Sequence, residues 1–392
     1  MYIATSGSEN RETVLALDET IDSLRTKIPS PNILIAYFTE CHDVALIHQT
    51  LVKAFPDTQI LGCSSCQGAM SDAEFYQQNA LVLWAAEDDL GAYGTAITQY
   101  HQEDAFHAAQ TCVEEAIAKS GRVGELPGLV LLHATPGNEE RVIEGIQSVI
   151  GPSVPVVGGS AADNQISGDW SVFTQSGFGR EAISLAVFYP SCPISLSFHS
   201  GYASTGVSAV ATKVEGREII ELDGEPAAPL YEAWITGNQL SPKGDFFSSA
   251  SLNPIGRIAG EINGMAYFKL SHPYEISDRN GIRLFSTVEQ GERVFLMAGT
   301  EERLVKRAGR VIDSALELGA GQIRPVGGLA IYCAGCMLQV REKMPEVKGF
   351  MYNAMHQMPF ASAFTFGEQG QFTGGENAHG NLMISAVLFH SE

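Results

Sequence analysis

Residues 32–86 contain, in order, NILIAYFT (32–39), DVALIHQTLVKAF (43–55), QILGCSSCQG (59–68) and NALVLWAA (79–86). The pattern is an apolar strand, an amphipathic helix, a second strand that ends in small residues, and a further strand. It recurs as LVLLHAT (129–135), NEERVIEGIQSVI (138–150), PVVGGSAADN (155–164) and AISLAVFY (182–189), and again as GLAIYCAG (328–335), REKMPEVKGFMYNAM (341–355), PFASAFTFGEQG (359–370) and NLMISAVLF (381–389). Three copies in the same order indicate an internal repeat.

The repeat predicts an α/β protein, made of two mixed-sheet halves built from a strand–helix–strand–strand unit. A chain of 392 residues exceeds one ordinary core, so we expect two domains, 1–225 and 226–392. Thr300 and Gly319 are the predicted N-cap and stop of a helix between them. The turn-rich segment 241–256 is predicted to be a loop.

Charge and composition exclude several classes of protein. The 24 Lys and Arg residues against 45 Asp and Glu residues give a net charge of −21, which argues against binding to nucleic acid or to an anionic membrane surface. The N-terminal residues lack the basic and apolar regions of an export signal. The odd number of cysteines, seven, is unlike a secreted disulfide framework. We therefore expect a cytoplasmic protein.

Three equivalent turns follow the second strand of each repeat unit, where α/β proteins bind ligands. Glycines there permit close backbone approach, and hydroxyl, amide and carboxylate groups offer polar contacts. The predicted ligand-binding residues are Gly62, Cys63, Ser64, Ser65, Gly158, Gly159, Ser160, Asp163, Asn164, Phe366, Gly367 and Glu368.

The motifs GCSSCQGAMSD, VPVVGGSAADN, IYCAGC and FTFGEQG, in this order, resemble the FIST family, whose members carry a FIST N-terminal and a FIST C-terminal domain. The resemblance covers the chain from about residue 30 to the end. It implies an intracellular sensory protein, not an enzyme, that binds a small ligand and acts in trans on a signalling partner such as a histidine kinase of a two-component system. Some members of this bare layout bind haem and sense nitric oxide. The oligomeric state stays open, with a homodimer among the alternatives.

Haem would need an axial ligand on its iron. We expect His379, in the glycine-rich GGENAHGNLM, as first choice and His272, in KLSHPYEIS, as second. Arg257, Arg283 and Arg324 are the candidate partners of the haem propionates.

Two alternatives use other chemistry. A small metabolite such as an amino acid would be held by the polar residues of the three turns. A zinc or thiol-redox site would use Cys63 with Cys66 and Cys333 with Cys336. The repeat aligns Cys63 with Gly159 and Cys66 with Ala162, which favours a requirement for small volume over thiol chemistry. No sequence signature of a hydrolase, kinase or dinucleotide-binding enzyme is present.

Overall fold

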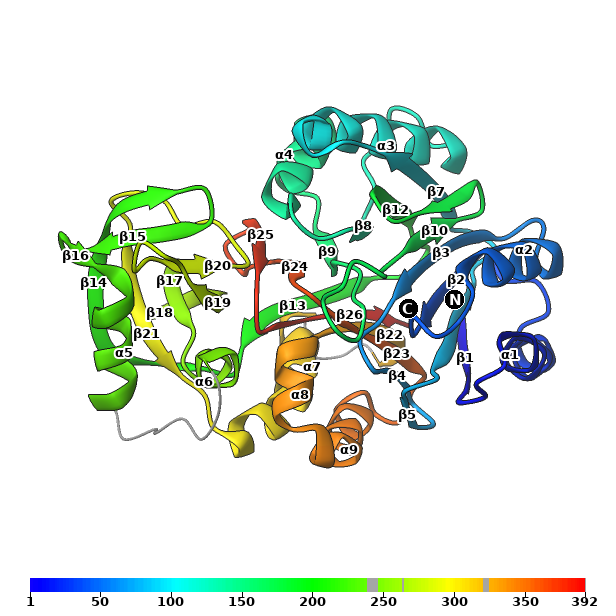
Figure 1. The fold of residues 1–392 in the computed structure, drawn as a ribbon. Coiled ribbons are helices and arrows are strands. Elements are labelled where there is room, and N and C mark those ends of the chain that lie inside the picture. The colour runs from blue at the N-terminus through cyan, green and yellow to red at the C-terminus, as the bar shows by residue number, and fades with distance from the viewer. Residues whose placement is uncertain (238–245, 263, 320–323, 392) are drawn as a thin grey trace.

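The computed structural model describes residues 1–237, 246–262, 264–319 and 324–391, and each repeat unit in it forms the centre of a six-stranded sheet (Figure 1). In every unit the first repeat strand pairs parallel with the second and antiparallel with the last. These central strands are β6 (Leu81–Glu87), β2 (Ile33–Phe38) and β3 (Gln59–Ser64) in the first unit, β12 (Ala182–Tyr189), β8 (Leu129–Ala134) and β9 (Val156–Gly159) in the second, and β26 (Met383–His390), β22 (Pro325–Cys333) and β23 (Phe360–Thr365) in the third.

A further strand extends each unit at one edge, so the repeat is longer than the sequence pattern suggests. Each of these strands pairs antiparallel with the last strand of its own unit. They are β1 (Tyr2–Ser8), β7 (Ala92–Gln99) and β13 (Ile194–Ser200). The predicted α/β class with mixed sheets is therefore confirmed.

At the opposite edge, each sheet is completed by a hairpin from a different unit. The hairpin of the second unit pairs with β3, that of the third with β9, and that of the first with β23. The three exchanges close a ring, and each of its three sheets contains strands from two units. These hairpins are β10 (Val172–Thr174) with β11 (Gly177–Gly179), β24 (Glu368–Gln371) with β25 (Asn377–Gly380), and β4 (Gly68–Ser71) with β5 (Phe75–Gln77).

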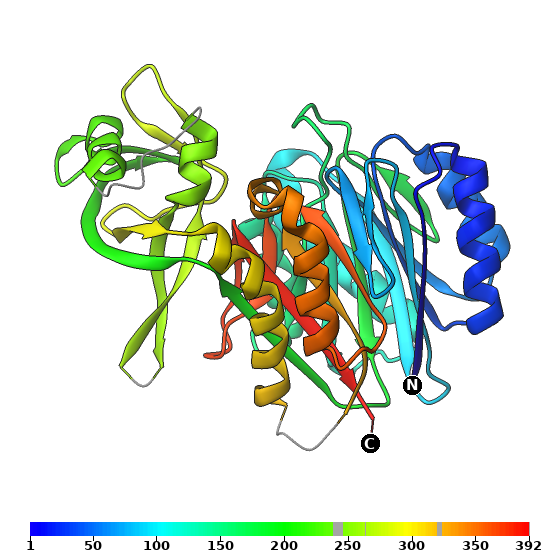
Figure 2. The same cartoon turned by 90° about the horizontal axis from the view of Figure 1, so that it is seen from below.

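The apolar residues of the three units meet in one central core between the sheets, which includes Tyr37, Leu131 and Ile331. Helices cover the outer faces and bury separate apolar layers there (Figures 1 and 2). The helices are α1 (Thr13–Lys27) and α2 (Val44–Ala54) on the first sheet, α3 (Ala105–Ser120) and α4 (Glu139–Ile150) on the second, and α7 (Glu301–Leu318), α8 (Ala334–Gln339) and α9 (Met344–Ala354) with the third. No helix in the described ranges has the length and apolarity that crossing a bilayer requires.

Residues 203–298 are inserted into the third unit between β13 and α7, and they form a separate lobe with its own apolar core (Figure 1). We call this segment the inserted lobe. Its elements are β14 (Ala203–Glu215), β15 (Glu218–Leu222), β16 (Glu225–Pro226), α5 (Ala227–Gly237), α6 (Phe246–Leu252), β17 (Ile255–Ile262), β18 (Met265–Ser271), β19 (Pro273–Ile276), β20 (Ile282–Leu284) and β21 (Arg293–Ala298), and the short helices η1 (Gln102–Asp104) and η2 (Arg341–Lys343) lie outside it.

The predicted helix after Thr300 is confirmed, because α7 begins at Glu301 and the Thr300 side chain accepts a hydrogen bond from the Arg303 amide. The predicted loop at 241–256 is wrong in part. Its residues 241–245 lie outside the described residues, but Phe246–Leu252 forms α6. The predicted domain boundary after residue 225 falls inside the inserted lobe, within β16.

Candidate functional site: a pocket between the ring and the inserted lobe

The three predicted turns lie side by side at the centre of the ring and bond to one another through the backbone. The Ala162 amide donates to the Ser64 carbonyl at 3.0 Å, and the Cys66 amide donates to the Phe364 carbonyl at 2.9 Å. The Ser160 amide donates to the Gly367 carbonyl at 2.9 Å. The turns thus form a closed network that holds the three units together.

Protein atoms fill the space in front of the four predicted glycines. A Cβ on Gly62 would overlap the Phe173 ring, and one on Gly158 would overlap the Leu132 carbonyl oxygen. A Cβ on Gly159 would overlap the side chains of Thr365 and Ile331, and one on Gly367 would overlap the His379 ring. These glycines therefore serve close packing within the protein, and their contact with a ligand stays a prediction.

The predicted hydroxyl groups are buried and bonded within the ring. The Ser64 hydroxyl accepts from the Ser171 amide at 2.9 Å, and the Ser65 hydroxyl accepts from the Phe364 amide at 2.8 Å. The Ser160 hydroxyl donates to Glu139 at 2.9 Å. Each hydroxyl thus has a structural partner inside the ring.

Two predicted carboxyl groups are fully buried and have opposite protonation preferences. Burial alone would raise the pKa of Asp163, but the backbone N–H groups of residues 166–169 hold it below its ordinary value. Asp163 thereby orders the loop that follows it. Burial raises the pKa of Glu368 well above its ordinary value, and that carboxyl group lies 2.9 Å from both the Thr365 hydroxyl and the Met383 amide.

A pocket of about 300 Å³ lies between the ring and the inserted lobe, and we call it the central pocket. Of the predicted ligand-binding residues, Asn164 and Phe366 line it; His272, Cys66 and Cys333 line it as well. Its aromatic walls come from both sides. Trp170 and Phe366 of the ring lie edge to face, with 6.2 Å between ring centroids, whereas Phe247, His272 and Phe285 belong to the inserted lobe.

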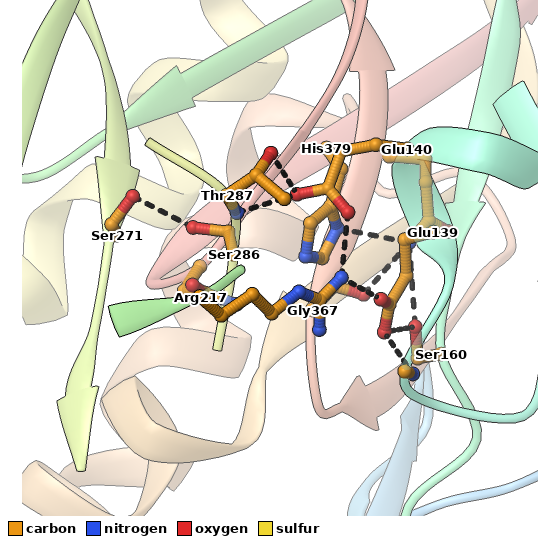
Figure 3. Close-up of polar contacts among 12 residues, drawn as sticks. Glu139, Glu140, Ser160, Arg217, Ser271, Ser286, Thr287, Gly367 and His379 are labelled. Atoms are coloured by element: carbon orange, nitrogen blue, oxygen red, sulfur yellow. Dashed lines mark hydrogen bonds and ion pairs between the residues drawn. The ribbon is translucent and has the colours of Figure 1, made fainter. Parts of the chain in front are cut away.

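A charged contact joins the two sides at the edge of this pocket (Figure 3). Arg217 follows Gly216 at the tip of the β14–β15 hairpin, where Gly216 has a φ of 58° that suits a tight turn. Its Nη2 donates to Glu139 and to Glu140, each at 2.6 Å. The Thr287 amide and hydroxyl donate to the other oxygen of Glu140, at 2.8 and 2.9 Å. We call Glu139, Glu140, Arg217 and Thr287 the clamp.

The two carboxylates and the guanidinium of the clamp are ionised, because their opposite charges stabilise one another in a buried place. Burial alone would raise the pKa of Glu139, but His379 and Arg217 hold it below its ordinary value. Burial opposes ionisation of Glu140 too, yet His379 and Arg217 lower its pKa to about 2. The clamp carboxylates also occupy the first turn of α4, where the helix dipole favours negative charge. Two carboxylates thus share one guanidinium.

His379 lies outside the central pocket. It faces a second hollow of about 220 Å³ that is lined by five carboxylates and by the cations Arg257 and Lys269. Its ring covers Gly367, and its Nδ1 lies 3.3 Å from the Gln369 amide nitrogen. The acidic residues of that hollow are Glu140, Glu144, Glu289, Glu292 and Glu376. Haem ligation by His379 therefore stays a prediction, in a hollow whose carboxylates outnumber its cations.

His272, by contrast, stands in the aromatic wall of the central pocket. Burial lowers its pKa to about 4, so the imidazole is neutral at physiological pH. Its ring centroid is 4.7 Å from that of Phe247, and its Nε2 lies 3.1 Å from the Ser251 hydroxyl. Because that hydroxyl donates to the Phe247 carbonyl at 2.9 Å, we infer that it accepts from Nε2. Nδ1 then carries the lone pair of the neutral imidazole.

The predicted propionate partners do not line the central pocket, but Arg257 lines the second hollow together with His379. Arg257 and Arg283 are bound to carboxylates of the inserted lobe, at 3.9 Å from Glu292 and 2.6 Å from Glu275. Arg324 is not among the residues that line the central pocket, and neither of the other two is. Arg217 is the arginine that the structure places at the pocket wall.

Of the four cysteines in the predicted zinc or thiol-redox site, Cys63 lies apart, whereas Cys66, Cys333 and Cys336 share the layer of the third sheet. Cys63 packs in the central core with Tyr37, whereas Cys66 packs with Met70 in the layer of the third sheet. Burial raises the pKa of the Cys63 thiol, which favours an unreactive thiol, and raises that of Cys66 to about 12. Within the described ranges, no three His, Cys, Asp or Glu side chains are grouped so as to hold a metal ion.

Sequence reasoning missed the clamp, Asn381 and the pocket aromatics Trp170, Phe247 and Phe285. Adjacent Glu139 and Glu140 at a helix start and the Gly216–Arg217 dipeptide of a hairpin were visible signals. Arg217 and Glu139 are 78 residues apart in the sequence, and a local sequence pattern cannot predict a contact between them.

A closed ring of three α/β units with an inserted lobe and a pocket between them defines a two-part α/β protein. The sequence matches the FIST N domain over residues 32–225 and the FIST C domain over residues 227–371, and the chain therefore belongs to the FIST family. FIST domains are associated with the sensing of small ligands in signalling.

Comparison with individual proteins shows remote similarity. An uncharacterized protein of Methanocaldococcus jannaschii is 22% identical over 271 residues, which are 66% of this chain and 49% of that protein, so the match spans about half of the relative's length. Cyanuric acid hydrolase from A. caulinodans aligns with a TM-score of 0.40 at 10% identity, over 100% of this chain and 99% of the other. The PurLQS structure from Thermotoga maritima aligns with a TM-score of 0.23 at 10% identity, over 78% and 73%.

Proposed function

We propose that this protein is a sensor that binds a small organic metabolite in the central pocket and transmits the binding to a separate signalling partner. The observation that carries the proposal is the position of the pocket. Its walls come from the ring and from the inserted lobe, and the clamp that joins these two parts borders it. Membership in the FIST family supports a sensory role.

The position of the pocket supplies a physical route from binding to signal. A ligand shifts a conformational equilibrium by as much as its affinities for the two states differ. A molecule that contacts Phe366 on one side and Phe247 on the other favours one placement of the inserted lobe relative to the ring. Action in trans on a partner such as a histidine kinase follows from the resemblance to FIST sensors and belongs to this proposal.

Filling the pocket should abolish ligand retention. Leu338 lines the pocket and is 38% exposed, so Leu338→Trp adds a large ring at the pocket with little effect on the core. We expect native mass spectrometry and metabolite extraction to find at least about tenfold less of any co-purified small molecule in Leu338→Trp, because two rings cannot share a cavity at the lower end of the usual size range.

The matched control is Leu126→Trp, since Leu126 is 64% exposed and does not line the pocket. This variant should retain small molecules as the wild type does. Equal small-molecule content in wild type and Leu338→Trp, after incubation with a cell extract, would contradict the proposed function.

A second candidate keeps haem as the ligand, with His272 in place of His379 on the iron. The favouring observation is a neutral imidazole in an aromatic wall, with its lone pair inferred to lie on Nδ1. Haem bound there would supply an iron centre that reacts with diatomic gases. A tetrapyrrole is larger than a cavity of about 300 Å³, so this candidate requires the two walls to move apart.

Titration with haemin tests this candidate. The expected result is a shifted Soret band in wild type and in His379→Ala, and no shift in His272→Ala, because His272 stands in the pocket wall and His379 does not. A band that stays unshifted in the wild type would exclude haem, and loss of the shift in His379→Ala alone would place the iron in the acidic hollow.

A further inference from the structure

We propose that the ligand of the central pocket is a neutral planar heterocycle that carries at least two hydrogen-bond acceptors, such as ring carbonyl groups. The inference rests on the proposed function and specifies its ligand class. Three features of the pocket wall carry it: unpaired donors, two carboxylates that already share one guanidinium, and aromatic rings on opposite sides.

The first donor is the amide nitrogen of Asn381. Asn381 is 3% exposed and lines the pocket, and its Oδ1 accepts from the His272 amide at 3.2 Å. Among the described residues nothing accepts a hydrogen bond from its Nδ2. Buried polar groups are almost always paired, and an unpaired donor in a pocket wall therefore indicates an acceptor on the ligand.

The second donor is the guanidinium of Arg217. Both of its hydrogen bonds to described carboxylates leave from Nη2, toward Glu139 and Glu140. A guanidinium has five N–H groups in one plane, so the three on Nε and Nη1 are not used in these two bonds, and Arg217 lines the pocket. The two carboxylates fix that plane before any ligand arrives, which suits recognition of a flat acceptor group.

Charge excludes a carboxylate ligand. Glu139 and Glu140 are both ionised beside one guanidinium, and burial keeps His272 neutral. Arg217 already bonds to both carboxylates, so a ligand carboxylate would compete with them for one guanidinium. A ligand carboxylate would add another buried negative charge, whereas a neutral carbonyl accepts the same hydrogen bonds without that repulsion.

Shape favours a flat molecule. Trp170 and Phe366 stand on the ring side of the pocket, and Phe247 and Phe285 stand on the lobe side. Aromatic walls stack on planar ligands and discriminate weakly among them, so the donors of Asn381 and Arg217 are left to provide the selection. A volume of about 300 Å³ accommodates one or two fused rings.

Isothermal titration calorimetry with three bicyclic probes tests the ligand class. Quinazoline-2,4-dione is neutral and has two carbonyl acceptors, indole has no comparable acceptor, and 2-naphthoate is an anion. We expect the dione to bind at least about tenfold more tightly than either of the others, since one buried hydrogen bond is worth about a factor of ten. Asn381→Leu should weaken dione binding about tenfold and leave indole binding unchanged.

Asn353→Leu is the control, because Asn353 is exposed on α9 and does not line the pocket. If Asn381→Leu fails to fold, Asn381→Asp keeps the Oδ1 acceptor and removes the donor, and the same loss is expected. Preference for 2-naphthoate, or equal binding of dione and indole, overturns the ligand class and leaves the pocket as a binding site. Absence of binding by all three probes overturns the class and counts against the proposed function, which the retention experiment with Leu338→Trp decides separately.

Discussion

Arg217→Met is expected to lower the free energy of unfolding of the first urea transition by about 3 kcal/mol. The side chains of Glu139 and Glu140 are 3% and 26% exposed, and Arg217 is the cation that bonds to both. Methionine keeps most of the volume and leaves two carboxylates facing each other without their counter-ion. Removal of one partner from a buried ion pair is destabilising because the remaining charge has lost its solvation and its partner.

Two comparisons separate this explanation from a simple loss of packing. Adding Glu139→Gln and Glu140→Gln to Arg217→Met removes the unpaired charges and should restore most of the lost stability. Arg283→Met is the matched control, since Arg283 and its partner Glu275 are 43% and 50% exposed, and such surface pairs contribute less than about 1 kcal/mol. An Arg217→Met protein as stable as Arg283→Met would show that the clamp does not hold the two parts together.

Gly158→Ala is expected to destabilise the protein by about 3 kcal/mol or more, measured by urea unfolding followed by circular dichroism. Gly158 pairs with Leu132 in the parallel ladder of β8 and β9, and a Cβ at this position would overlap the Leu132 carbonyl oxygen. A backbone atom within a sheet cannot rotate aside as a side chain can, so the ladder itself has to shift.

Gly349→Ala provides the contrast. Gly349 lies within α9, and among the described residues no heavy atom beyond its chain neighbours and its own helix backbone lies within 4 Å of its would-be Cβ, so alanine should stabilise this helix by about 0.5–1 kcal/mol. The comparison also distinguishes two roles for Gly158. A glycine needed for ligand approach would tolerate alanine in the unliganded protein and lose affinity, whereas a glycine needed for packing loses stability first.

The helices and strands that depend on a local sequence pattern can be predicted from the sequence. Alternation of apolar strands and amphipathic helices locates the three units, and Thr300 with its following glutamates locates the start of α7. The same pattern brings the three turns together, because equivalent strand ends in a repeat meet. A glycine-rich turn, however, has the same sequence whether a ligand or a Phe173 ring occupies the space before it.

The central pocket itself depends on contacts that no local pattern contains. Asn381 and His272 are 109 residues apart in the sequence, and Thr287 is 147 residues from Glu140. These residues come close together because the inserted lobe folds back onto the ring and packs against its turns. The sequence signals for Trp170, Phe247 and Phe285 are those of ordinary apolar residues, and their common wall exists only once the chain has closed on itself.

Because the three units exchange hairpins, the ring cannot form during synthesis until the C-terminal strands have been made. β9 is completed by β24, and β4 is completed by β23, so strands made early wait for strands made near the C-terminus. Until then the growing chain carries an open sheet edge and an unpaired hairpin, the features by which nascent proteins associate wrongly. The exchanged hairpin is complete at Gly380, and β26, which the third sheet also needs, ends at His390. Translation past residue 390 is therefore the point at which the ring can close.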